Sequence, residues 1–219
     1  RYRVNVLVDN SSVHGAPIVN ESNPTFQNLV GRVEHMAQFG ALVTDFNMIK
    51  PGALHAANGG FLVLEARDIL TKPYAWDALK RTLKTGQVNI EDIAQQMGWA
   101  TTSTLDPEPI PFSAKIVIMG EPYLYYLLYQ LDPDFQELFK VKADFDMMLD
   151  RTEDNEHLYC KFVGHICQVE NLPHLTPEAV ARVVEQASRL VEDQRKLPVR
   201  FADLADLVPD HAKIVWVYS

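Results

Sequence analysis

The sequence predicts an α/β domain built on a parallel sheet, followed by a small all-helical domain. Short, continuous apolar runs at residues 61–66 and 114–119 alternate with helical stretches, as buried parallel strands do. From about Glu153 onward the pattern changes to helices alone. We therefore expect an α/β domain over residues 1–150 and a helical domain over residues 151–219.

The first elements are predicted from periodicity and turn residues. Residues 2–8 alternate at period two and predict a strand. Residues 9–24 are rich in Asn, Ser, Gly and Pro and predict a loop. Residues 25–39 carry apolar side chains at helical spacing, and Gly40 is well placed to end that helix.

The later elements follow the same rules. Thr176 and Pro177 suit the N-cap and first turn of one helix. Segments with helical periodicity predict helices over residues 75–85, 123–131, 156–170 and 176–194, and a further one from about Phe201. A hairpin is predicted over 88–111 and a last strand over 141–149.

Composition excludes several classes of protein. Hydrophobic residues make up 47% and charged residues 22% of the 219 residues, the balance of an ordinary soluble domain. The net charge of −9 argues against a broad nucleic-acid surface, which needs clustered Lys and Arg. Two cysteines do not make a secreted disulfide scaffold. No stretch reaches the ~18 apolar residues of a membrane helix, and the start does not resemble a signal peptide, so we expect a cytoplasmic protein without a membrane partner.

The segment that indicates chemistry is KPGALHAANGGFLVLEARDIL, residues 50–70. Its buried strand delivers Glu65 at the carboxyl end, and ligands of open α/β sheets bind outside the carboxyl ends of strands. An acid there can hold Mg²⁺ through water beside a nucleotide's phosphates. Many buried strands end in an acid, so on these residues alone an ordinary strand end is the simpler interpretation.

This segment resembles the Walker B region of AAA+ proteins, in the form found in archaeal-type Lon and its bacterial Lon-like relatives. A GxLHxAxxGxLhhD string leads into the Walker B strand there, and GALHAANGGFLVLE is similar to it. Further similarity follows in order: WDALKRTLKTGQVNIED resembles the helix after Walker B, PEPIPFSAKIVIMGE the approach to sensor 1, DPDFQELFKVKADFDMML the arginine-finger region, and KLPVRFADLADLV the sensor 2 helix of the lid. The resemblance covers nearly the whole chain.

The resemblance implies a partial AAA+ P-loop-type core followed by a helical lid, with ATP and Mg²⁺ bound in the complete protein. Glu65 takes the Walker B position and would help hold Mg²⁺. Glu121 falls at or near sensor 1, Lys140 is the nearest basic candidate for the finger, and Arg200 takes the sensor 2 position.

Departures from the family pattern qualify what the resemblance implies. Ala66 stands where an active ATPase has the Glu that orients the attacking water, and Lys140 lacks the planar fork of a finger arginine. No GxxxxGK[ST] string occurs, so we expect the first strand and Walker A to be missing and the chain to start at the second strand. Either another polypeptide supplies the first strand, or it is absent and the sheet is rearranged. The serines lie in no Ser–Lys dyad motif, so the chain is not expected to cut peptides by itself.

Two functions follow as expectations. In the first, the parent protein is an ATP-dependent Lon-like serine protease, a homo-hexameric ring that threads protein substrates to a downstream Ser–Lys domain. The loop over residues 40–50 would then face the pore, with Phe46, Met48 and Ile49 touching substrate, and buried packing of the loop is the close alternative. In the second, the chain is a degenerate AAA+ scaffold or switch that does not hydrolyse ATP, as Ala66 and the missing finger arginine favour.

Other clusters have simpler interpretations. His157, Cys160, His165 and Cys167 lack zinc-finger spacing, and one helix cannot aim all four at one ion, so packing is preferred over a metal site. His55 is expected to cap a turn rather than to face a phosphate. The tyrosines of 123–129 suggest core or interface packing more than a stacking platform, and Lys80, Arg81 and Lys84 suggest a solvated helix face more than contacts to a neighbour's nucleotide.

Overall fold

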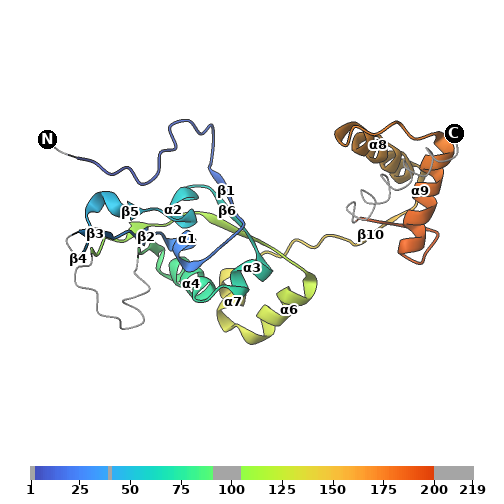
Figure 1. Cartoon of the computed structure of the whole chain (residues 1–219). Coiled ribbons are helices and arrows are strands. Elements are labelled where there is room, and N and C mark those ends of the chain that lie inside the picture. The colour runs from blue at the N-terminus through green and yellow to red at the C-terminus, as the bar shows by residue number, and fades with distance from the viewer. Residues whose placement is uncertain (1–2, 39–40, 91–104, 200–219) are drawn as a thin grey trace. The chain divides into compact units, whose positions relative to one another are not determined.

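The computed structural model describes residues 3–38, 41–90 and 105–199 (Figure 1). The chain forms two compact units, Arg1–Val141 and Lys142–Ser219. The change of sequence pattern after residue 150 therefore falls inside the second unit. Within the described residues, no helix is long and apolar enough to cross a membrane.

The first unit is built on a parallel sheet of three strands in the order β1-β6-β9 (Figure 1). These strands are β1 (Ile18–Glu21), β6 (Phe61–Glu65) and β9 (Lys115–Met119). Both predicted strands form and lie side by side, with β6 in the middle, but the burial predicted for the second is wrong, because none of the residues of β9 is fully buried. Leu62 and Leu64 of β6 are fully buried on one face of the sheet.

The strand predicted over residues 2–8 is wrong, because residues 3–8 are not in a strand and β1 lies inside the predicted loop. Val4 and Val6 are 80% and 66% exposed, so the alternating apolar side chains of this segment do not face a core. β1 alternates over only four residues between turn-forming neighbours, and pairing with β6 makes it a strand.

Four helices bury their apolar sides with Leu62 and Leu64 in one core. They are α1 (Phe26–Val30), α2 (Ala53–Ala56), α3 (Ala66–Thr71) and α4 (Ala75–Thr85). Helix α4 has the predicted bounds and ends at Gly86, whose φ of 66° is left-handed. The opposite face of the sheet is much more open: Ile18 is 74% exposed, Val117 41% and Met119 47%.

The helix predicted over residues 25–39 is wrong beyond Val30. Gly31 ends α1 with a φ of 87°, and a Cβ on it would lie 2.5 Å from the Lys50 carbonyl oxygen. Two antiparallel ribbons follow in its place. One pairs β2 (Arg32–Val33) with β5 (Ile49–Lys50), and the other pairs β3 (Met36–Gln38) with β4 (Ala41–Val43), followed by the short 3₁₀ helix η1 (Phe46–Met48).

The last part of the first unit agrees with prediction. β7 (Gln87–Val88) pairs antiparallel with β8 (Ile110–Pro111), as the predicted hairpin requires. Helix α6 (Pro122–Leu131) leads directly into α7 (Pro133–Leu138), whose N-cap is Asp132.

The second unit contains two helices and a short ribbon. Helices α8 (Glu153–Val169) and α9 (Pro177–Leu190) share a core, and Thr176 caps α9 as predicted by accepting from the Ala179 N–H. The predicted last strand is corrected: only β10 (Met148–Asp150) forms, and it pairs antiparallel with β11 (Lys196–Pro198) instead of joining the parallel sheet. The helix expected from Phe201 lies outside the described residues.

Candidate functional site

Parallel pairing brings the carboxyl ends of three strands to one edge of the sheet. Glu21 is level with Leu64, and Glu65 is level with Met119. Glu121 follows β9 by two residues and is the N-cap of α6. The sequence-predicted pair Glu65 and Glu121 therefore stands at one edge, the side where ligands of open α/β sheets bind.

The chain is tightly packed where β6 and β9 end. Ala66 is buried, and a Cβ on Gly120 would lie 2.7 Å from the Ala66 Cβ, closer than real Cβ contacts allow. At the next residue of each segment, Arg67 Nη2 donates a hydrogen bond to Glu121 Oε1 at 3.2 Å. Sequence reasoning missed Arg67, although its position two residues after Glu65 was a signal.

The edge suits a magnesium ion held through water. The Glu65 side chain is exposed, so its carboxylate can accept from a hydrated cation without a desolvation cost. A nucleotide needs donors around its phosphates as well, and a string of the GxxxxGK[ST] type is absent from the 219 residues. The edge therefore fits the metal-holding part of a nucleotide site.

The other two predicted nucleotide contacts are not brought to this edge by the described residues. Lys140 is exposed in the segment after α7, and no hydrogen bond or ion pair in the described part joins it to Glu65 or Glu121. Arg200 lies outside the described residues. Both stay predictions.

The predicted substrate contacts differ in exposure. Phe46 is 46% exposed on η1, whereas Met48 and Ile49 are half-buried and Ile49 pairs with Val33. The Asn5 side chain donates hydrogen bonds to the carbonyl oxygens of Phe46 and Ile49 at 2.8 and 3.1 Å. Among the three predicted residues, Phe46 is the one that offers a large apolar surface.

Two of the three cations of α4, Lys80 and Lys84, form ion pairs with acids at the start of α7. Lys80 Nζ donates to Asp132 Oδ2 at 2.9 Å, and the Trp76 indole N–H donates to the same oxygen at 2.7 Å. Lys84 pairs with Asp134 at 2.5 Å. Lys80 is largely shielded from water, so the solvated face expected of it is corrected to a partly buried ion pair that fastens α4 to α7. Asp132 was missed at the sequence level, although Asp-Pro is a helix-start signal.

His55 caps its own turn, as expected. Its Nδ1 accepts from the Gly52 N–H at 3.2 Å, so Nε2 carries the proton, and within the described atoms that buried Nε2 has no partner. Burial lowers the pKa of His55 to about 4, which keeps the imidazole neutral.

The two remaining clusters are the His and Cys side chains of α8 and the tyrosines of α6. Among the described residues, no group of three or more metal-binding side chains gathers. Cys160 is exposed and Cys167 is buried, so these two thiols of α8 face different surroundings. Tyr125 packs against Phe135 with ring centroids 5.5 Å apart, while Tyr123 remains 55% exposed.

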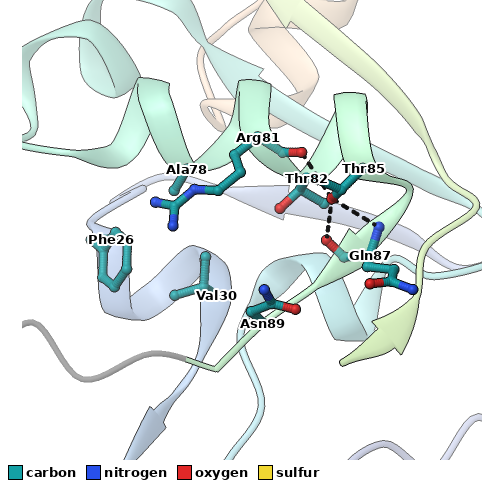
Figure 2. Close-up of a pocket in the computed structure, with 8 residues that line it drawn as sticks. All are labelled: Phe26, Val30, Ala78, Arg81, Thr82, Thr85, Gln87 and Asn89. Carbon is teal, nitrogen blue, oxygen red and sulfur yellow. Dashed lines mark hydrogen bonds between the residues drawn. The ribbon is translucent and has the colours of Figure 1, made fainter. Parts of the chain in front are cut away.

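Two hollows lie one in each unit, and the residues that line them are not those at the strand ends. The first, about 10 Å³, holds one water molecule at most and is framed by α1, α4 and β7 (Figure 2). Its lining comprises Phe26, Val30, Ala78, Arg81, Thr82, Thr85, Gln87 and Asn89. The second is a groove of about 430 Å³ between α8 and α9, with apolar walls and Arg151, Glu156 and Cys160 along it. Neither contains a sequence-predicted site residue.

Solved structures with the same fold include NtrX from Brucella abortus. It aligns with 91% of this chain and 41% of its own at a TM-score of 0.56 and 17% identity. NtrX in complex with ATP aligns with 88% of this chain and 38% of its own at a TM-score of 0.53 and 19% identity. At these identities the likeness shows the fold alone, an AAA-like α/β core followed by helices.

Curated relatives are Lon proteases that are much longer than this chain. A putative Lon protease homolog of Escherichia coli is 24% identical over 76% of the chain and 28% of its own length. The archaeal Lon proteases of Halobacterium salinarum and Archaeoglobus fulgidus are 22% and 24% identical, each over 93% of the chain and 29% and 32% of their lengths. The chain thus spans about a third of these relatives or less.

Two family profiles match consecutive parts of the sequence. Residues 14–146 match the LonB-like AAA domain, and residues 174–209 match the AAA+ ATPase lid domain of archaeal LonB. The first match covers more than half of the chain. It includes the parallel sheet, Glu65 at the end of β6 and the Arg67–Glu121 pair. The chain belongs to the LonB-like AAA domain family and is an AAA+ module of the Lon-like type.

Proposed function

We propose that this module binds Mg-ATP at the carboxyl edge of β1-β6-β9, as part of an ATP-dependent Lon-like protease. The observation that supports the proposal best is the meeting of Glu65 and Glu121 at the ligand-binding edge of a family AAA+ sheet. Among structural neighbours, NtrX has been solved with ATP and with ADP. In the whole protein, the module would work in a hexameric cytoplasmic ring that passes unfolded substrate to a downstream Ser–Lys protease domain.

The candidate residues divide into nucleotide contacts and substrate contacts. Glu65 would hold Mg²⁺ through water, and Mg²⁺ neutralises charge on the phosphates when bound. Lys140 and Arg200 would supply positive charge to the phosphates. Phe46 would grip the substrate, with Met48 and Ile49 supporting the turn that presents it.

One observation favours a second candidate, a module that binds ATP and switches without hydrolysing it. The Ala66 side chain is buried against Gly120, so position 66 has no room for the carboxylate that would orient a water molecule. In this case nucleotide occupancy alone would set the state of the ring.

Equilibrium binding of Mg-ATP to the intact protein tests the proposal. We expect Glu65→Gln to weaken Mg-ATP binding about tenfold at fixed Mg²⁺, because the metal loses a charged anchor. The matched control is Glu34→Gln, since Glu34 is paired with Arg32 on β2, away from the strand ends. Equal affinity of wild type and Glu65→Gln would refute the assigned site. Single-turnover phosphate release from bound ATP then separates the candidates, since the switch releases none.

A further inference from the structure

We propose that Arg67 is a positioning residue that neutralises Glu121, so that the carboxyl edge can accept an anionic ligand. The inference rests on the proposed nucleotide site and assigns a function to a residue that does not itself hold the metal. It concerns the charge that a triphosphate meets as it approaches the ends of β6 and β9.

The first step is the position of the pair. Arg67 lies in the first turn of α3, immediately after β6, and Glu121 lies between β9 and α6. Their side chains therefore bridge the ends of two neighbouring parallel strands, with the Arg67 nitrogen 3.2 Å from the Glu121 oxygen. The tight contact of Gly120 with Ala66 fixes the two backbones at this point, so the bridge has a defined span.

The second step is the charge at the edge. Glu21, Glu65 and Glu121 all stand at or just beyond the strand ends. The negative charge of Glu65 can bind a hydrated cation, for which carboxylates are preferred ligands. A second free carboxylate close to it would repel the phosphates that the cation brings. Arg67 removes that repulsion by pairing with Glu121.

The third step is the accessibility of the pair. The side chains of Arg67 and Glu121 are 61% and 59% exposed, so the pair contributes little to folding. Removing the Arg67–Glu121 pair should leave the fold intact and change the electrostatic potential that an incoming ligand meets. An arginine suits this task, because it stays charged at every physiological pH.

Mg-ATP affinity of the intact protein, measured in four variants, tests the inference. We expect Arg67→Ala to weaken binding five- to tenfold, and Glu121→Gln, which keeps a polar side chain at that position, to weaken it by no more than about threefold. The double variant Arg67→Ala/Glu121→Gln should recover to within about threefold of wild type, because the unpaired carboxylate has gone. Arg67→Lys should also stay within about threefold. The loss in Arg67→Ala should shrink in high salt.

The outcomes separate the inference from the proposed function. If wild type binds no Mg-ATP, both fail. If wild type binds and Arg67→Ala binds equally well, the inference alone is overturned. It is also overturned if the double variant is as weak as Arg67→Ala, because Arg67 would then act directly on the ligand. The matched control is Arg32→Ala, which breaks the Arg32–Glu34 pair of β2 and should leave affinity unchanged.

Discussion

Lys80 and Asp132, 52 residues apart in sequence, form an ion pair that is largely shielded from water, with Nζ 2.9 Å from Oδ2. Asp132 also accepts from the Trp76 indole and from the Asp134 backbone N–H, so one carboxylate holds α4, the end of α6 and the first turn of α7 together. Burial alone would raise the pKa of Asp132, but the hydrogen bonds from Lys80 and Trp76 and the lysine charge outweigh it, and its pKa lies below the ordinary value.

Asp132→Ala should lower the free energy of unfolding of the first unit by about 1–3 kcal/mol, because it removes a helix cap and leaves the shielded Lys80 with only its longer pairs to Asp77 and Asp134, at 3.5 and 3.7 Å. Asp132→Asn keeps the capping oxygen and should cost less. Lys84→Met is the matched control, since the Lys84–Asp134 pair is more exposed and should contribute under about 1 kcal/mol. Urea denaturation measures the free energy of unfolding of the three variants, and hydrogen exchange of α4 peptides shows whether α4 opens more readily. A loss of stability in Lys84→Met as large as that in Asp132→Ala would contradict the role given to Asp132.

The same carboxylate predicts acid sensitivity. A group whose pKa is lowered by folding stabilises the native state above its unfolded pKa, and this contribution is lost as the pH falls through the folded value. The Asp132 contribution should therefore be complete at neutral pH and disappear below about pH 4. In Asp132→Asn, stability below pH 4 should fall less steeply than in wild type.

His55 predicts a second pH dependence, in a higher range. Its pKa of about 4 lies below the ordinary 6.5, so the unfolded chain binds a proton more readily, and stability should fall as the pH drops from about 6.5 toward 4. The full loss is about 3 kcal/mol. His55→Asn retains an acceptor for the Gly52 N–H and should be less stable than wild type at pH 7. Its free energy of unfolding should change less with pH between 4.5 and 6.5. Parallel slopes for the two proteins would rule His55 out as the cause.

The contact between Gly120 and Ala66 predicts an unusual glycine effect. Gly120→Ala should destabilise the first unit by about 1–3 kcal/mol, because the new methyl overlaps the Ala66 side chain. Gly164→Ala is a control of opposite sign: nothing lies within 4 Å of a Cβ at this position in α8, so helix propensity should stabilise it by up to about 1 kcal/mol. Thermal unfolding of both variants checks the difference.

Alanine substitutions at Phe46 and Ile49 should distinguish a role in substrate contact from a role in stability. Phe46→Ala should change stability by less than about 0.5 kcal/mol, because the ring is half exposed, and should slow degradation of an unfolded protein by the intact enzyme. Ile49→Ala should cost more stability, because Ile49 is half-buried and pairs with Val33. Unchanged degradation by Phe46→Ala would remove Phe46 from the substrate path.

The sequence predicted those parts of the fold whose local signals agree with their surroundings. The apolar stripe of residues 75–85 and the cap at Thr176 act within single helices, so their predictions were confirmed nearly to the residue. The runs in β6 and β9 were recognisable because both faces of a parallel strand are largely apolar. The convergence of Glu65 and Glu121 followed from that strand assignment.

The errors arose where a distant partner decides the structure. Nothing local distinguishes the alternation of residues 3–8, which pair with no strand in the described part of the chain, from that of β1, which lies beside β6. The short helix α1 ends because Gly31 must approach the Lys50 carbonyl, a contact set by the β2–β5 ribbon. β10 likewise depends on β11, some 50 residues later. The Arg67–Glu121 pair was missed for the same reason, since it requires the register of β6 against β9.

The two cysteines of α8 allow the opening of the second unit to be measured by thiol labelling. Cys160 is exposed and should react with a thiol reagent as fast as a free peptide does, whereas Cys167 is buried among α8, α9 and β11. The second thiol can react only when the helix pair opens, so its labelling rate reports that opening in the native protein. Repeating the labelling with Mg-ATP present would show whether the proposed ligand changes how often the helix pair opens, without any engineered probe.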